Sequence, residues 1–517
     1  MGIISCVIVY FIGRELFNEW AGFIAGILCA CYGLFIFFEG LLIYAALSLL
    51  FSLFAFLYIL HIKDNTRPVN MLAFGFFLGL ATITQGNIIL FGFLAVLWLL
   101  FQNKAKLRER IKLLSFFIIG FALVLGMLVL RSYVVEKDIS PVAENIGFNF
   151  FVGNNAGADG TFKNPDFITG SGEGIVKDAR IFASLAMRRQ LKPSEVSNFW
   201  ACMAMNYIRQ DPLGCVRLLV KKTAYVFSPH EFIYEPEYYL IYDKIKIFRL
   251  ALMDLRYVLP FALLGMTLGI SRIKALMPLY IAVFSFALSG IIFFVNAKFR
   301  IGMVPFLAIF AAFGFIRTID YARRRQLSKF LLCIIFAAFI FIYNSLSEVK
   351  AQVSTYYNIN NAFTNHFEAA KKYIEENKFK DALRELRLAE KLEPDNPDLY
   401  YFFGIVFYEI SDYTNAEKKF KKAVAARPFF ADGYYNLGIV YNKEGRFYDA
   451  IRTLQRCISL EPDDYQAHFE LGLAKKGKGD FDGAKKEFEL TLKYASQKGI
   501  NCADSVKKEM QGLGKTP

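Results

Sequence analysis

Apolar runs of helical length recur through the first 350 residues of the chain. They occupy about 1–12, 21–38, 41–60, 70–84, 87–101, 113–130, 251–270, 276–295, 302–318 and 330–345. A helix needs roughly 20 apolar residues to cross a bilayer, and several of these runs are shorter. The pattern predicts an all-α polytopic membrane domain of about ten transmembrane helices, at 1–130 and 251–345, divided by a polar loop domain at 131–250.

A second pattern, with a period of 34 residues, follows the membrane part. It is formed by Ala382, Ala416, Ala450 and Ala484, by Gly404, Gly438 and Gly472, and by Pro394, Pro428 and Pro462. Small residues let two antiparallel helices approach closely, and proline ends the second helix. Residues 360–498 are therefore predicted to form an α-solenoid of tetratricopeptide repeats that binds a protein or peptide partner. Residues 499–517 are expected to be a polar C-terminal tail that either caps the repeats or is disordered.

Composition and charge narrow the class of protein. The 517 residues are 55% hydrophobic and 17% aromatic, which excludes an ordinary soluble enzyme. Residues 1–350 hold 34 Lys and Arg against 21 Asp and Glu, whereas 351–517 hold 26 against 25. The basic residues of the first part lie between apolar runs, where they orient membrane helices, so membrane lipids rather than nucleic acid are the expected neighbours. The eight cysteines include no CxxC pair, so no metal site is predicted.

The basic residues also predict which side of the membrane each loop faces. Alternate short breaks hold Arg14, Lys63, Arg67, Lys104 to Lys112, Arg272, Lys274 and Arg317 to Lys329. These breaks are expected on the cytoplasmic side, which makes the long loop and everything after about 345 extracytoplasmic. Lys298 and Arg300 are the only basic residues in a short outer loop, and Arg131 stands at the outer end of the sixth run. They are either cations that snorkel at helix ends or cations that meet an anion.

The most distinctive part of the long loop is the segment 147–162. Its first half alternates like a short strand, with Phe148, Phe150 and Val152 on one side, so the loop is expected to be of mixed structure. Its second half is rich in Gly and Asn. There Asn154, Asn155 and Asp159 either cap neighbouring backbone in an ordered turn or help to position a substrate. A calcium loop is a poor match, because Gly157 occupies a ligand position.

Four segments give the chain a family resemblance. They are Gly13 to Phe17 with Ala21 to Ala25, the exit Arg131-Ser132-Tyr133 into the loop, the loop motif 149–160, and the segment from Lys298 to Pro305. Their order resembles the membrane glycosyltransferases of the dolichyl-phosphate-mannose protein mannosyltransferase and aminoarabinose transferase superfamily.

This resemblance implies an inverting enzyme of the bacterial inner membrane. It would move a sugar from a polyprenyl-phosphate donor to an envelope lipid, glycan or protein acceptor on the outer face. By the same resemblance, Arg131, Lys298 and Arg300 would hold the lipid phosphate, so that no metal or other cofactor is required. The loop residues Asn154, Asn155 and Asp159 would help to position the acceptor. Arg300→Ala is then expected to weaken donor use more than folding.

Glu39 is the candidate catalytic base, because it is the only acid in a short outer loop and a carboxylate at membrane depth is costly. It is alternatively a helix cap that faces water. The family places its principal acid in a first outer loop, which this chain is expected to lack together with the first helix. Tyr44 stands where many relatives place a second acid. The alternative functions are a non-catalytic membrane scaffold that uses the repeats for envelope assembly, and a lipid-linked polymerase or transporter.

Overall fold

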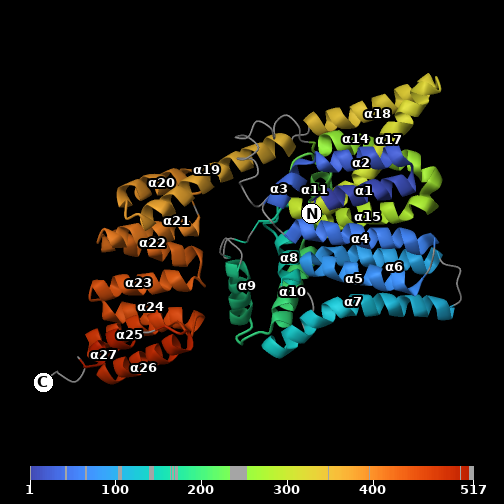
Figure 1. Ribbon diagram of the computed structural model, residues 1–517. Helices are drawn as coiled ribbons and strands as arrows, with labels where there is room; N and C mark the ends of the chain where they lie inside the picture. The colour runs from blue at the N-terminus through green and yellow to red at the C-terminus, as the bar shows by residue number, and fades with distance from the viewer. Residues whose placement is uncertain are drawn as a thin grey trace. The chain divides into compact units, whose positions relative to one another are not determined.

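A computed structural model gives the fold of the chain (Figure 1). It describes residues 2–40, 44–64, 67–102, 107–138, 145–163, 165, 168, 173–232, 253–346, 349–394, 396–500 and 502–511. The described residues are almost entirely helical, and the predicted class, a helical membrane part followed by an α-solenoid, is confirmed. Parts of the predicted loop at 139–144 and 233–250, and of the predicted tail at 512–517, lie outside these residues.

The chain divides into two compact units. The membrane unit holds residues 1–163 and 189–355, and the repeat unit holds residues 164–188 and 356–517. A short piece of the long loop, 164–188, therefore belongs to the repeat unit. The helix α19 (Val349–Glu375) carries the chain from the first unit into the second.

The long helices of the membrane unit run roughly side by side (Figure 1). The N-terminal group is α1 (Gly2–Leu16), α2 (Glu19–Ala30), α3 (Gly33–Gly40), α4 (Tyr44–Asp64), α5 (Pro68–Thr84), η1 (Gly86–Ile88), α6 (Ile89–Gln102) and α7 (Leu107–Glu136). The loop helices of this unit are α8 (Ile146–Gly153), α10 (Pro193–Gln210) and α11 (Pro212–Val226). The later helices are α14 (Leu255–Gly269), η2 (Ile270–Arg272), α15 (Ile273–Ile292), α16 (Ala297–Arg300), η3 (Ile301–Met303), α17 (Val304–Arg323) and α18 (Leu327–Leu346).

Five helical segments of the described chain are long and apolar enough to cross a membrane. They are Tyr44–Ile62, Leu107–Val135, Leu255–Ile292, Ala297–Arg323 and Leu327–Ser345. The expectation of about ten spans is not confirmed, because Glu19–Ala30, Pro68–Thr84 and Gly86–Gln102 are apolar but shorter. The apolar run at 21–38 is two helices, α2 and α3. They separate where the backbone of Cys31 and Gly33 exchanges hydrogen bonds with Met253 (2.8 and 3.2 Å) instead of continuing a helix.

Close backbone approaches bring the membrane helices together. A Cβ at Gly265 of α14 would lie 1.9 Å from the carbonyl oxygen of Phe310 in α17, and a Cβ at Gly120 of α7 would lie 2.1 Å from the carbonyl oxygen of Leu72 in α5. Helices in a bilayer associate through such small-residue contacts, since lipid is as apolar as their side chains. Any side chain at these two positions would push the helices apart.

The strand predicted at Phe148, Phe150 and Val152 is wrong. These residues belong to α8, in which Phe148 and Phe151 both pack on Trp200, with ring centroids 5.3 and 4.8 Å away. Alternation of apolar and polar residues indicates a strand when one face of the segment is buried and the other faces solvent. Here α10 covers one side of the helix, while on another side Gly153 lies against Phe293, whose carbonyl oxygen would be 1.7 Å from an added Cβ.

The repeat unit is a stack of helix pairs. After α19 come α20 (Phe379–Leu392), α21 (Pro397–Glu409), α22 (Tyr413–Ala426), α23 (Ala431–Lys443), α24 (Phe447–Leu460), α25 (Tyr465–Lys478), α26 (Phe481–Gln497) and α27 (Ala503–Gln511). The glycines of the 34-residue pattern lie where two helices meet. A Cβ at Gly438 would be 2.5 Å from Leu454, and one at Gly472 would be 2.5 Å from Phe488. The tetratricopeptide prediction is confirmed, and Val506 of α27 covers the last pair with 1% of its surface exposed.

Candidate functional site

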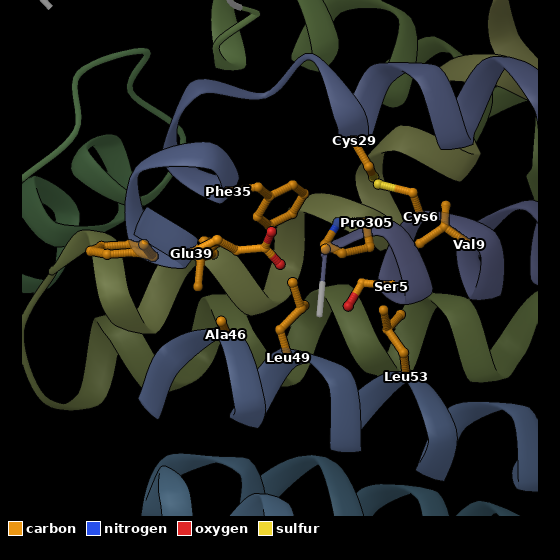
Figure 2. Close-up of a pocket in the computed structure, with 13 residues that line it drawn as sticks. Ser5, Cys6, Val9, Cys29, Phe35, Glu39, Ala46, Leu49, Leu53 and Pro305 are labelled. Atoms are coloured by element: carbon orange, nitrogen blue, oxygen red, sulfur yellow. The ribbon is translucent and has the colours of Figure 1, made fainter. Parts of the chain in front are cut away.

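A pocket opens in the membrane unit between α1, α2, α3, α4, η3 and the first turn of α17 (Figure 2). Its empty volume, which includes its opening to solvent, is about 380 Å³. The walls are mostly apolar, with Val9, Phe35, Leu49 and Leu53 among them. Ile301 and Pro305 also line it, so the pocket joins the N-terminal helices to the Lys298 to Pro305 segment, although these are far apart in the sequence.

Glu39, the predicted base, lines this pocket. It is the one acidic residue among the described residues of the lining. Figure 2 shows its carboxylate pointing into the pocket beside the ring of Phe35, with Ser5 and Leu49 on facing walls. Gly2 leaves room for it, since a Cβ there would lie 2.4 Å from both carboxylate oxygens. A carboxylate is a chemically competent base, and this one faces the interior of the pocket.

Lys298, one of the predicted phosphate ligands, lies near the first turn of α4. Its ammonium is 5.5 Å from the ring centroid of Tyr44, which follows Glu39 closely in the sequence. The backbone around it is held by buried polar side chains. The Gln85 amide donates to the Lys298 carbonyl (2.9 Å) and accepts from the Ser48 hydroxyl (3.0 Å). The segment that carries Lys298 is thus fixed to the helices that form the pocket.

Arg300 lies in a different environment, with 4% of its surface exposed. Its guanidinium donates to the carbonyl oxygens of Ser228 (2.6 Å) and His230 (2.7 Å), and it forms an ion pair with the carboxylate of Glu231. The hydroxyl of Tyr32 donates to the other oxygen of that carboxylate (2.7 Å). These contacts join the end of α11 to α16. The assignment of Arg300 to the lipid phosphate stays a prediction, and these protein contacts give the side chain a structural task.

Asn154 lies inside the loop domain, 3% exposed. Its side-chain amide donates to the carbonyl oxygens of Phe150 (2.8 Å) and Ile292 (2.9 Å), and its oxygen accepts from the ammonium of Lys222 (3.0 Å). Lys222 is fully buried, and this burial lowers the pKa of its ammonium to about 8. Asn154 therefore connects α8, α15 and α11 around a buried lysine.

The other predicted loop and phosphate residues lie apart from the pocket lining. The Asn155 amide donates to the Phe151 carbonyl (2.9 Å), and its oxygen accepts from the Gly157 amide (2.8 Å). Asp159 accepts from the backbone and hydroxyl of the nearby Thr161 (2.8 and 2.7 Å). Both side chains thus make the local capping contacts that were one of the two alternatives. Arg131 is exposed on α7, which packs against α5.

Several residues of these arrangements escaped prediction. Gln85 was not among the predicted site residues, although a Gln between apolar runs indicates a buried hydrogen-bonding group. Glu231, Lys222 and Tyr32 carried no signal, because each meets its partner only in the folded chain. Among the described residues no group of three or more His, Cys, Asp or Glu is arranged to hold a metal.

A polytopic helical unit with a carboxylate pocket, joined to a solenoid of helix pairs, defines the class as a membrane protein that carries tetratricopeptide repeats. Residues 1–129 match the family model described as dolichyl-phosphate-mannose-protein mannosyltransferase. Residues 367–431 and 431–464 match tetratricopeptide repeat models. The resemblance inferred from the sequence is confirmed in this form: the N-terminal residues 1–129 match the mannosyltransferase family model, and matches to tetratricopeptide repeat models follow.

Solved structures similar to the chain include three of different kinds. A crystal structure of MamA protein is 25% identical and covers 36% of this chain and 93% of its own, with a TM-score of 0.25. A mutant Thermobaculum terrenum O-GlcNAc transferase is 22% identical over 27% of this chain and 26% of its own, with a TM-score of 0.25. The APC/C hetero-tetramer Cut9-Hcn1 is 13% identical over 90% and 93%, with a TM-score of 0.29. No curated protein matches the chain.

The Asn154–Lys222 contact gives a prediction for stability. Asn154→Ala should destabilise the protein by about 3 kcal/mol, because a buried ammonium then loses its hydrogen-bond acceptor. Asn155→Ala, which removes local caps only, should cost about 1 kcal/mol. Thermal unfolding in detergent would measure both. Adding Lys222→Met to Asn154→Ala should restore most of the loss, and equal losses for the two asparagine variants would refute this role of Asn154.

Proposed function

We propose that the membrane unit is a glycosyltransferase that moves a sugar from a polyprenyl-phosphate donor to an envelope lipid, glycan or protein acceptor. The observation that carries the proposal is the Glu39 carboxylate. It points into a pocket lined by the Lys298 to Pro305 segment, and it lies within the residues that match the mannosyltransferase family model. The protein is an integral membrane protein. We further propose that it lies in a bacterial inner membrane with the reaction on the outer face.

The proposed reaction is a single displacement with inversion at the anomeric carbon. The acceptor hydroxyl attacks that carbon while the Glu39 carboxylate takes its proton. The bond between the anomeric carbon and the phosphate oxygen breaks, and the leaving group departs as polyprenyl phosphate. The pocket walls are mostly apolar, which disfavours water that would otherwise compete with the acceptor and weaken electrostatic interactions.

The proposed task of Lys298 is to bind the lipid phosphate. Its ammonium lies over the ring of Tyr44, a residue close in sequence to Glu39. Lys298 also belongs to the Lys298 to Pro305 segment, which lines the pocket. A cation there stabilises the negative charge that develops on the phosphate as the leaving group departs. Arg131 and Arg300 remain proposed helpers. Asn154, Asn155 and Asp159 are proposed to act for the acceptor by holding the loop in shape rather than by touching the acceptor.

One observation favours the alternative of a non-catalytic membrane scaffold for envelope assembly. Tyr44 occupies the place of a second acid, and its ring lies against Lys298. A scaffold of this kind would recruit a protein or peptide through its repeats and would have no need to bind a lipid phosphate. Donor binding therefore separates the two proposals.

We expect the purified protein in detergent to bind a polyprenyl phosphate and to bind the matching uncharged polyprenol much more weakly, as measured by native mass spectrometry. Lys298→Ala should weaken phosphate binding about tenfold, which corresponds to 1.4 kcal/mol. Lys274→Ala, a lysine on the predicted cytoplasmic side, is the matched control and should leave binding unchanged. Equal binding of the phosphate and the alcohol would favour the scaffold.

The proposed orientation makes a separate prediction. A reporter fused after residue 350 should behave as a protein outside the cytoplasm, because the basic short breaks orient the preceding helices. An alkaline phosphatase fusion at this point should be active, and a green fluorescent protein fusion routed through the general secretion pathway should be dark. The reverse pattern would overturn the orientation and with it the reaction on the outer face.

A further inference from the structure

One helix of the long loop belongs to the repeat unit. The helix α9 (Glu173–Ala186) lies between α8 and α10 in the sequence, yet it packs with the repeats as one compact body. Its Ile181 and Leu185 lie against a buried cluster formed by Ala431, Cys457, Leu460 and Ala467. A tetratricopeptide surface is thus already in contact with a segment of its own chain.

The packing of α9 depends on both small and large side chains. Ala179 and Ala183, one turn apart, are 3% and 0% exposed, so this side of the helix is covered closely. The ring of Phe182 meets the ring of Phe429 edge to face, with centroids 5.1 Å apart. Edge-to-face aromatic pairs stabilise a contact by more than the burial of their apolar area alone. The ring pair therefore gives the contact between α9 and the repeats a defined geometry.

Charge complements the apolar contact. The ammonium of Lys177 on α9 lies 2.7 Å from a carboxylate oxygen of Glu461, at the end of α24. Asp432, at the start of α23, adds negative charge near the same lysine. An exposed ion pair adds little to affinity, but it fixes the direction in which a helix can lie.

We propose that the surface formed by Phe429, Ala431, Leu460 and Glu461 is a binding site for an amphipathic helix with a basic residue, and that α9 of the same chain is its resident ligand. The repeats then hold the long loop of the membrane unit in cis. A separate partner must present a helix of the same kind and displace α9. The proposal does not depend on sugar transfer, only on both segments facing the same side of the membrane.

The contact can be tested by zero-length cross-linking of the full chain in membranes. A carbodiimide activates the Glu461 carboxylate and should join it to the Lys177 ammonium as an amide, identified by mass spectrometry of the linked peptides. The product should migrate as a monomer. Lys177→Arg keeps the charge but forms no stable amide, so the link should vanish. The pair Lys476 and Glu509, 2.9 Å apart within the repeats, serves as the internal positive control.

A variant with Phe182→Ala and Leu185→Ala tests whether the apolar face holds the helix. The link between Lys177 and Glu461 should fall several-fold in this variant, while the link between Lys476 and Glu509 stays, which shows that the repeats remain folded. Three results would overturn the proposal: no Lys177 link beside a strong control link, a linked product that migrates as a dimer, or an unchanged yield in the double variant.

Discussion

Replacing Arg300 with alanine should destabilise the membrane unit by about 3–5 kcal/mol, because the buried Glu231 carboxylate then loses its counter-charge. The carbonyl oxygens of Ser228 and His230 lose their donor in the same substitution. This is the reverse of the expectation from the sequence, in which the variant mainly weakens donor use. Thermal unfolding of the purified protein in detergent would measure the loss.

A double substitution separates the two accounts of Arg300. Arg300→Met with Glu231→Leu replaces the ion pair by apolar groups and should recover much of the stability, because no charge remains buried. Lys298→Ala is the matched control on the same segment and should melt near the wild type. An Arg300→Ala variant that keeps wild-type stability but loses donor binding would show that the guanidinium serves the lipid phosphate instead.

Glu39→Gln should lower the rate of sugar transfer by about 10²–10⁴-fold, since the amide cannot accept the proton of the acceptor hydroxyl. The substitution keeps the shape of the side chain, so the apolar walls should keep their packing and donor affinity should change little. Initial rates at saturating donor would measure the effect, with donor binding measured in parallel.

Glu19→Gln is the control for a change of charge alone, because Glu19 is an exposed acid at the start of α2 and lies outside the pocket lining. Its rate should equal that of the wild type. A Glu39→Gln variant that transfers sugar at an undiminished rate would remove this carboxylate from the reaction.

The repeats could be predicted in detail because their determinants are local. Each glycine of the series meets a side chain of the paired helix 16 residues later, as Gly438 meets Leu454 and Gly472 meets Phe488. A short fixed separation of this kind produces a visible period in the sequence. Glu39 could be singled out from the sequence because a single acid among apolar residues stands out. Its position was predicted wrongly, since it lies in the last turn of α3 and not in a loop.

The rest depended on contacts between distant segments. Arg300 and Glu231 are separated by 69 positions, and a basic residue in an outer loop looks the same whether it meets a lipid phosphate or a buried carboxylate. The break at Cys31 exists because Met253 supplies its hydrogen bonds. The docking of α9 on the repeats could not be predicted for the same reason. The sequence of an amphipathic helix shows that one face is buried but not which surface covers it.

Release of polyprenyl phosphate tests most directly whether the protein transfers a sugar at the Glu39 pocket. The purified protein in liposomes is supplied with polyprenyl-phosphate-linked sugars and a membrane extract as the source of acceptor, and the release of free polyprenyl phosphate is followed beside the Glu39→Gln variant. We expect the wild type to release one polyprenyl phosphate for each sugar transferred, and the variant to release almost none. Equal release by the two proteins, or none by either across the range of donors, would contradict it.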